Sequence, residues 1–331
     1  MHKFTDIGQF RNVVKAVRSD HDYQGKDEDG KAIYRHTSPY PSLVFRGTVK
    51  LHGTNAAIVK YADGHYEFQS RQRVLSLGSD NAGFYAAMQL EPYQAMFNGV
   101  AFDDYCAVYG EWCGGNIQSG VGIAQCEKMF IPFAVKIDGE YNHDALVGLM
   151  WGGKQVYDFD NFREVVDFNA PEESQPRLAK FTEDVEAECP VTYALTGKRG
   201  VGEGVVWEGW HDDERYIFKV KGEKHSVSKV KTLAAVDPEE IAKMREFVEY
   251  AVTENRLLQG ISVLQEQDKE LCPKSTGDFL GWVIRDIIKE EEDVLVANKL
   301  DVKKVGKYLS EAAKNWWFAH LDALAMEVPC E

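Results

Sequence analysis

The spacing of apolar residues changes several times along the chain. Residues 6–18 carry apolar side chains every three to four positions, which predicts an amphipathic helix. Residues 19–42 are polar and rich in Gly, Pro, Asp and Ser, which predicts a loop. From about residue 43 to residue 137, short runs rich in β-branched and aromatic residues alternate with turn residues, and this pattern is typical of β-strands.

Two pairs of β-prone runs predict hairpins. Asp63-Gly64 separates one pair, and HDDE separates GEGVVWEGW from RYIFKVKGE. Residues 82–97 predict a helix interrupted at Pro92, and residues 143–188 predict one or two surface helices. The N-terminal part of the chain therefore predicts an α+β domain built on antiparallel sheets.

Beyond Pro238 the period is helical almost throughout. The segment PEEIAKMREFVEYAV begins with Pro and has acidic residues in its first turn, which is typical of a helix start. Two more helical segments follow, DFLGWVIRDIIKEEEDVL and KKVGKYLSEAAKNWWFAHLDALAM. The predicted domains are residues 1–235 and an all-helical domain of residues 236–331, with the boundary near Ala234–Pro238.

Two local features of the helical segment lead to structural predictions. The acidic run 289–293 is expected to form a solvated helix face or loop. Trp316, Trp317 and Phe318 are expected to pack between helices.

Length and cysteine content narrow the class of protein. The 331 residues are enough for two domains with separate cores. The six cysteines include no C-x-x-C pair, which argues against a zinc site and a disulfide framework and favours a reducing compartment. No run of 18 apolar residues predicts a transmembrane helix, and the first 20 residues lack the apolar core of a secretory signal. We expect a cytoplasmic monomer, in the host cytoplasm if the chain is phage-encoded.

The charge is strongly negative in total but uneven along the chain. A formal net charge of −15 argues against a broad nucleic-acid-binding surface, since phosphate neutralisation supplies much of that affinity. Residues 219–231, however, hold five lysines and a single acid, whereas the segment from Pro238 onward holds 12 basic and 19 acidic residues. A short basic strip suits the handling of individual phosphates better than the coating of a long polyanion.

Five short segments carry residue types suited to phosphate chemistry. They are KLHGTN (50–55), SRQR (70–73), YGEW (109–112), EGVVWEG (203–209) and FKVKGE (218–223). Each is common by itself, since a lysine at a strand end is usually a snorkelling surface residue and a lysine pair is usually solvated. Their joint occurrence in this order is the informative signal.

Lys50 can act as a nucleophile only after it loses a proton. Nearby cations lower a lysine pKa because they disfavour a second positive charge. Lys219 and Lys221 alternate along one predicted strand and so share a face. We therefore predict that these two lysines lie beside Lys50 and lower its pKa, and that Gly53 lets the backbone approach a phosphate.

These segments resemble the nucleotidyl motifs of the covalent nucleotidyltransferases, which include ATP-dependent ligases and capping enzymes. The pattern K-x-H-G-x-N resembles the RNA ligase 2 family, the phage and RNA-editing branch that seals RNA nicks, whereas DNA ligases and capping enzymes usually show K-x-D-G-x-R. The resemblance spans roughly residues 43–231. It implies a nucleotidyltransferase (ATP-grasp-like ligase) domain of antiparallel sheets with flanking helices.

The resemblance also implies an activity and its requirements. The implied enzyme is an ATP-dependent RNA ligase that joins a 3′-OH to a 5′-phosphate through a covalent lysyl-AMP and requires Mg²⁺ or Mn²⁺. The implied partner is a nicked duplex of RNA or an RNA/DNA hybrid, recognised through shape, phosphates and 2′-hydroxyls.

Each motif residue acquires a role from the resemblance. On the nucleophile side, Lys50 attacks the α-phosphate of ATP, His52 assists the nucleotidyl steps, and Asn55 positions AMP and the acceptor end. For nucleotide binding, Arg71 contacts ribose and phosphate with Arg73 as its competitor, Glu111 accepts hydrogen bonds from the ribose, and Phe133 stacks on adenine. Around the phosphate, Glu203 binds divalent metal or assists nick closure, and Lys219 and Lys221 hold the α-phosphate.

Three positions depart from the family pattern. Val49 and Ala134 stand where acidic residues are common, and Glu208 stands where lysine is common. Two enzymatic alternatives remain open, a DNA ligase and an mRNA-capping-type guanylyltransferase. From another class, a non-catalytic nucleic-acid-binding repair protein also remains open, although the complete set of motif residues argues against a decayed site.

Overall fold

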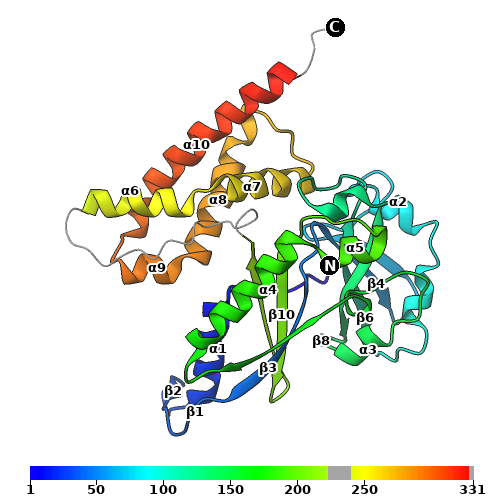
Figure 1. Cartoon of the computed structure of the whole chain (residues 1–331), viewed down its shortest axis with the longest axis horizontal. Coiled ribbons are helices and arrows are strands. Elements are labelled where there is room, and N and C mark those ends of the chain that lie inside the picture. The colour runs from blue at the N-terminus through cyan, green and yellow to red at the C-terminus, as the bar shows by residue number, and fades with distance from the viewer. Residues whose placement is uncertain (223–239, 328–331) are drawn as a thin grey trace. The chain divides into compact units, whose positions relative to one another are not determined.

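The computed structural model describes residues 1–222 and 240–327 (Figure 1). The chain forms two compact units, Met1–Lys224 and His225–Glu331. Each unit buries its own hydrophobic core. The predicted boundary near Ala234–Pro238 lies outside the described residues, as do the lysines of the basic strip that follow Gly222.

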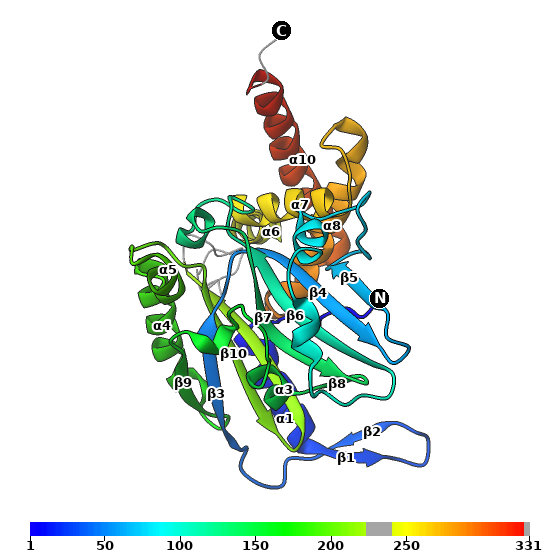
Figure 2. The ribbon, with the colours of Figure 1, turned by 90° about the vertical axis from the view of Figure 1, so that its right-hand side faces the viewer.

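Two antiparallel sheets and a small hairpin make up the strands of the first unit (Figure 2). The four-stranded sheet has the order β11-β10-β3-β9, formed by Glu214–Lys221, Gly204–His211, Ser42–Val49 and Phe162–Asp167. The five-stranded sheet has the order β5-β4-β6-β7-β8, formed by Tyr66–Ser70, Gly53–Tyr61, Tyr105–Cys113, Met129–Ile137 and Glu140–Tyr141. A separate two-stranded sheet pairs β1 (Tyr23–Lys26) with β2 (Ala32–Tyr34).

Both predicted hairpins are confirmed. β4 and β5 pair antiparallel around Asp63-Gly64, and β10 pairs antiparallel with β11 along its whole length. In β3, Leu43 and Phe45 are buried while Ser42, Val44 and Arg46 are exposed, so this part of the strand turns one face to the core. The predicted α+β class with antiparallel sheets is therefore confirmed.

The helices of the first unit agree with the prediction in part. Its α-helices are α1 (Phe10–Asp22), α2 (Phe84–Met88), α3 (His143–Val147), α4 (Gln175–Ala187) and α5 (Pro190–Thr196). Its 3₁₀ turns are Tyr93–Phe97, Gly122–Gln125, Val156–Asp158 and Pro171–Ser174. The interruption at Pro92 is confirmed.

The predicted loop over residues 19–42 is wrong in part, because α1 continues to Asp22 and the β1–β2 hairpin follows it. Residues 143–188 contain the surface helices α3 and α4, and also a strand, β9, that was not predicted.

The second unit is all-helical over its described residues, as predicted. Its helices are α6 (Glu240–Ala251), α7 (Glu254–Glu266), α8 (Thr276–Glu290), α9 (Glu292–Ala297) and α10 (Val302–Glu327), with a 3₁₀ turn at Pro273–Ser275. Trp317 is fully buried and stacks on Phe279 at 4.5 Å between ring centroids, which confirms its packing role. Phe318, by contrast, is partly exposed.

The acidic run 289–293 is not simply a solvated surface. Glu291 is fully buried, and its carboxylate oxygen Oε1 lies 3.1 Å from Nη2 of Arg256, which is also fully buried. Tyr250 donates a hydrogen bond to the other carboxylate oxygen at 3.0 Å. The prediction was wrong for Glu291, because a buried charge is tolerated where a cation and a hydrogen-bond donor both reach it.

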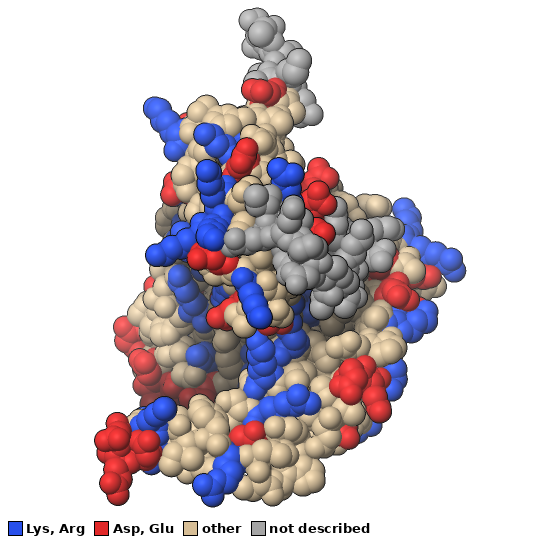
Figure 3. Space-filling view, turned by 90° about the vertical axis from the view of Figure 1, so that its left-hand side faces the viewer, with Lys and Arg blue, Asp and Glu red and all other residues tan. Residues whose placement is uncertain are grey.

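Two further surface properties follow from the structure. No helix among the described residues is long and apolar enough to cross a membrane. The face drawn in Figure 3 carries many Lys and Arg side chains as well as clusters of Asp and Glu. The net charge of −15 therefore does not make every face of the chain uniformly acidic.

Candidate active site

The segment KLH lies at the junction of the two sheets. β3 of the four-stranded sheet ends at Val49 and β4 of the five-stranded sheet begins at Gly53, so residues 50–52 link one sheet to the other. The Lys50 amide donates to the Gly204 carbonyl oxygen at 2.8 Å, which ties this link to the start of β10.

Glu203 brings three of the predicted site residues together. One carboxylate oxygen, Oε2, accepts a hydrogen bond from Lys50 Nζ at 2.7 Å and lies 2.9 Å from His52 Nδ1. The other oxygen, Oε1, lies 2.9 Å from Lys221 Nζ. The Glu203 side chain is only 1% exposed, so little solvent screens these contacts. Residues from three distant segments of the sequence therefore converge on one buried carboxylate.

The charge balance at Lys50 is opposite to the prediction. Burial acts to lower the pKa of Lys50, but the carboxylates of Glu203 and Glu111 and the hydrogen bond to Glu203 outweigh it. The pKa of Lys50 is therefore raised above its ordinary value. The prediction of a lowered pKa was wrong because it considered the neighbouring lysines without the carboxylate between them.

The contacts with the three nitrogen groups lower the pKa of Glu203. Burial acts to raise the pKa of Glu203, but Lys50, Lys221 and His52 outweigh burial and hold that pKa well below its ordinary value. Glu203 is therefore a stable anion that holds Lys50 as an ammonium.

Lys219 and Lys221 occupy alternate positions on β11, opposite Val206 and Gly204 of β10. Lys221 lies beside Lys50, as predicted, through their shared contact with Glu203. Lys219 lies two residues before it on the same side of the strand, and its amide donates to the Gly8 carbonyl oxygen at 3.0 Å. The two lysines thus form a basic edge next to the nucleophile.

Two motif glycines are required by close backbone packing. A Cβ on Gly53 would lie 2.3 Å from the Trp112 carbonyl oxygen on the neighbouring strand. Gly204 has a φ of +152°, and a Cβ there would lie 2.2 Å from the Val220 carbonyl oxygen. The glycines that follow His52 and Glu203 therefore allow strands to approach closely on both sides of the site.

Asn55 and Glu111 face each other across β4 and β6. They are paired in register, so their side chains lie on the same face of the five-stranded sheet. Glu111 is near enough to Lys50 to raise its pKa, which places this face beside the nucleophile.

Arg71 and Arg73 have different surroundings. Arg71 forms an ion pair with Asp6, and both side chains are about half exposed. Its positive charge also acts on Lys50, which places it near the nucleophile. Arg73 instead donates a hydrogen bond to the Asp80 carbonyl oxygen at 2.9 Å, within its own loop. The geometry thus favours Arg71 over Arg73 for a contact with nucleotide.

Phe133 lies on β7 against the N-terminal segment, which contains none of the five motifs. Its ring meets that of Phe4 edge-on, with the centroids 5.0 Å apart, and Phe4 also packs against Tyr109 and Tyr141. Gly8 forms a bridge with Phe218 on β11. Residues 4–8 thus contact both sheets beside the site. The helix predicted over residues 6–18 is wrong for residues 6–9, because α1 begins at Phe10 and Gly8 instead bridges to β11.

The positions that depart from the family pattern have structural roles here. Val49 and Ala134 are buried. Glu208 accepts hydrogen bonds from Trp210 Nε1 and Arg215 Nη2, both at 3.0 Å. Glu208 therefore forms an ion pair with Arg215 at a position where lysine is common in the family.

The site as a whole is suited to nucleotidyl transfer. A lysine, two carboxylates and several further cations lie where two sheets meet, and transfer at phosphorus depends mainly on positioning and on positive charge around the phosphate. A family model described as RNA ligase matches residues 44–221, more than half of the chain. The chain therefore belongs to the RNA ligase family.

Comparisons with whole proteins are less close. No curated protein matches the chain. Among solved structures, it is similar to a mutant of the RNA ligase of Naegleria gruberi with ATP and Mn, with 16% identity and a TM-score of 0.45. It is also similar to that RNA ligase with PPi, with 17% identity and a TM-score of 0.44. These matches cover 68% of this chain and 57% and 56% of those chains, so the chain matches little more than half their length.

Proposed function

We propose that the chain is an ATP-dependent RNA ligase that joins 3′-OH and 5′-phosphate ends through a lysyl-AMP on Lys50. The observation that carries this proposal is the convergence of Lys50, His52 and Lys221 on Glu203 in a chain of the RNA ligase family. The reaction would comprise three transfers: AMP to Lys50, AMP to the RNA 5′-phosphate, and displacement of AMP by the 3′-OH.

In the first transfer, Lys50 Nζ forms a bond to the α-phosphorus of ATP while the bond from phosphorus to pyrophosphate breaks. The ammonium must lose its proton first, and Glu203 opposes that loss because it stabilises the charged form. Release of Lys50 from Glu203 is therefore part of activation in this proposal. Lys221 and Lys219 then face the charge that develops on the α-phosphate.

The carboxylates also fit a divalent cation. Glu203 and Glu111 offer oxygen ligands, the type that Mg²⁺ and Mn²⁺ prefer, and Glu203 already attracts three nitrogen groups at 2.7–2.9 Å. Mg²⁺ or Mn²⁺ bound there would supply additional positive charge at the phosphates.

The remaining residues would bind the nucleotide and the RNA. Arg71 would contact phosphate or ribose, Glu111 the ribose hydroxyls, and Phe133 the adenine ring. Asn55, which lies opposite Glu111, would position AMP and the acceptor end. The substrate would be a nick in duplex RNA or an RNA/DNA hybrid, bound by a monomer in the cytoplasm.

Transfer of label from ATP to the protein tests this function. The chain is incubated with α-labelled ATP and Mg²⁺, and the denatured protein is separated on a gel. We expect label from ATP but not from GTP, and none in Lys50→Ala. Lys60→Ala is a matched control, since this lysine lies on β4 over the rings of Tyr66 and Phe102. Label from GTP alone, or label retained in Lys50→Ala, would overturn the proposal.

A panel of nicked duplexes, with RNA or DNA on each side of the nick, then defines the substrate. We expect sealing with RNA at the nick. Sealing of all-DNA nicks alone would indicate a DNA ligase.

A further inference from the structure

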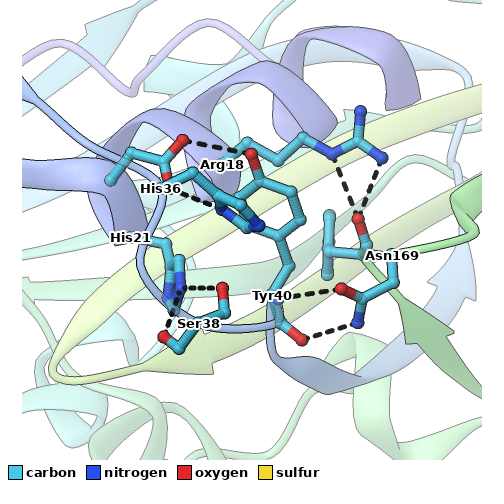
Figure 4. A network of polar contacts seen from close by, with 8 residues as sticks. Arg18, His21, His36, Ser38, Tyr40 and Asn169 are labelled. Carbon is cyan, nitrogen blue, oxygen red and sulfur yellow. Dashed lines mark hydrogen bonds and ion pairs between the residues drawn. The ribbon is translucent and has the colours of Figure 1, made fainter.

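We propose that His21, Asp22 and His36 form a binding site for a divalent metal of the zinc class, at the base of the β1–β2 hairpin. One ligand atom from each of the three residues lies within 4.8 Å of the other two. Figure 4 shows the rings of His21 and His36 gathered around Tyr40. Among the described residues, this is the one group of three or more His, Cys, Asp or Glu side chains that meets such a spacing.

The donor set and its spacing suit zinc. Two imidazoles and one carboxylate are typical zinc ligands, and a three-residue set leaves a position for a further ligand. His36 Nδ1 lies 3.0 Å from Asp22 Oδ1. Zinc–ligand bonds of about 2.0–2.2 Å place two tetrahedral donors roughly 3.3 Å apart, so this pair needs to separate by only a few tenths of an ångström.

A shell of hydrogen bonds orients the carboxylate. Tyr40 donates its hydroxyl to Asp22 Oδ2 at 3.1 Å, which leaves Oδ1 directed at His36. The Tyr40 backbone is held in turn by the Asn169 side chain, through hydrogen bonds of 2.9 and 2.8 Å. Groups that bond to the ligands of a metal fix their orientation and raise its affinity.

The C-terminal end of α1 favours a cation. His21 and Asp22 are the last two residues of α1, and the C-terminal end of a helix carries partial negative charge. Ser38 lies on the other side of His21, with its carbonyl oxygen and its hydroxyl each 3.1 Å from His21 Nε2.

The position of the site suggests a structural role. β1 and β2 pair with each other and with no other strand in the described part of the chain, and the hairpin projects from the end of α1 in Figure 2. A two-stranded hairpin is marginally stable by itself. Asp22 immediately precedes β1 and His36 follows β2 by two residues, so a shared ion would close the hairpin at its base. Cysteine spacing, which predicted no zinc site, does not report on a site built from histidine and aspartate.

Metal binding to the full chain tests the proposal. After treatment with a chelator and its removal, Zn²⁺ is titrated in competition with a chromophoric chelator, and Co²⁺ is added as a spectroscopic probe. We expect one tight Zn²⁺ per chain, strong visible absorption from four-coordinate Co²⁺, a higher Tm, and slower proteolysis within residues 23–34 when Zn²⁺ is bound.

His36→Ala is the informative variant, because the side chain is 51% exposed and its loss should leave the fold intact. Since loss of an outer partner alone typically costs about 10–100-fold in affinity, loss of this ligand should weaken Zn²⁺ binding by more than about 100-fold. His65→Ala is the matched control, because this similarly exposed histidine contacts a single carboxylate, that of Asp63. Equal Zn²⁺ affinity in wild type and His36→Ala, or the weak absorption of six-coordinate Co²⁺, would overturn the proposal.

Discussion

Replacement of Glu203 by glutamine should lower the pKa of Lys50. The substitution removes the charge 2.7 Å from Lys50 Nζ while keeping the shape of a side chain that is 1% exposed. A single opposite charge at this range shifts a pKa by about 1–3 units, and each unit changes the fraction of free amine about tenfold below the pKa. The substitution also leaves Lys221 without its carboxylate partner, so the positive charge of Lys221 acts in the same direction.

The assay measures how fast Lys50 reacts with trinitrobenzenesulfonate, an electrophile that only the free amine attacks, with loss of sulfite. The modified peptide is quantified by mass spectrometry between pH 7 and pH 11, without nucleotide. A raised pKa means that the ammonium persists to higher pH, so the wild-type midpoint should lie above the ordinary value of 10.5. At pH 8, Glu203→Gln should react about 10–1000-fold faster than wild type.

Glu208→Gln provides the matched control for this experiment. Glu208 lies on the adjoining strand and binds Arg215 instead of a site lysine, so its substitution should leave the Lys50 profile unchanged. An unchanged or raised midpoint in Glu203→Gln would refute the account of Glu203 as the group that keeps Lys50 charged. Formation of lysyl-AMP should nevertheless fall in Glu203→Gln, because the proposed function assigns the carboxylate a role with bound nucleotide.

Three further predictions concern binding and stability. Arg71→Ala should raise the ATP KM for lysyl-AMP formation. It should change the free energy of unfolding by less than about 1 kcal/mol, because the ion pair between Arg71 and Asp6 is exposed, and a larger loss in a urea melt would contradict this. Glu291→Ala should cost about 1–3 kcal/mol in a urea melt, since it removes one of the two carboxylates that pair with the buried Arg256, the other being Asp286 at 2.9 Å, whereas the double change Arg256→Met with Glu291→Leu should recover part of that loss. Gly53→Ala should cost about 1–3 kcal/mol and lower the Tm, because its Cβ would overlap the adjoining strand; an unchanged Tm would show that the strands can separate.

Features that depend on neighbouring residues in the sequence were predicted well. The turn at Asp63-Gly64 and the break at Pro92 follow from backbone preferences of the residues themselves, and both are present. The motif residues Lys50, Lys221 and Glu203 do meet, because the order of strands brings their separate segments to one junction. Local pattern and motif order were therefore sufficient for the α+β class and for these three members of the cluster, although β9 and the β1–β2 hairpin were missed.

Features that depend on burial and on distant partners were not predictable in the same way. The sign of the Lys50 pKa shift depends on which charge lies nearest in space, and the sequence does not specify that distance. Glu291 is charged and lies in an acidic run, yet Arg256, 35 residues away, makes its burial possible. The place of Phe4 beside Phe133 likewise depends on how an extended segment crosses between sheets. Each of these properties requires the packed structure.

The nucleophile lies on a three-residue link between the sheets, and this position makes the length of that link critical. An inserted residue would add roughly 3.3 Å of extended chain, more than the 2.7 Å that separates Lys50 Nζ from Glu203. Core residues of either sheet can be replaced by residues of similar size without changing the distance between Lys50 Nζ and Glu203. In directed evolution, residues 50–52 should therefore tolerate neither insertion nor deletion, while the strands on either side accept repacking.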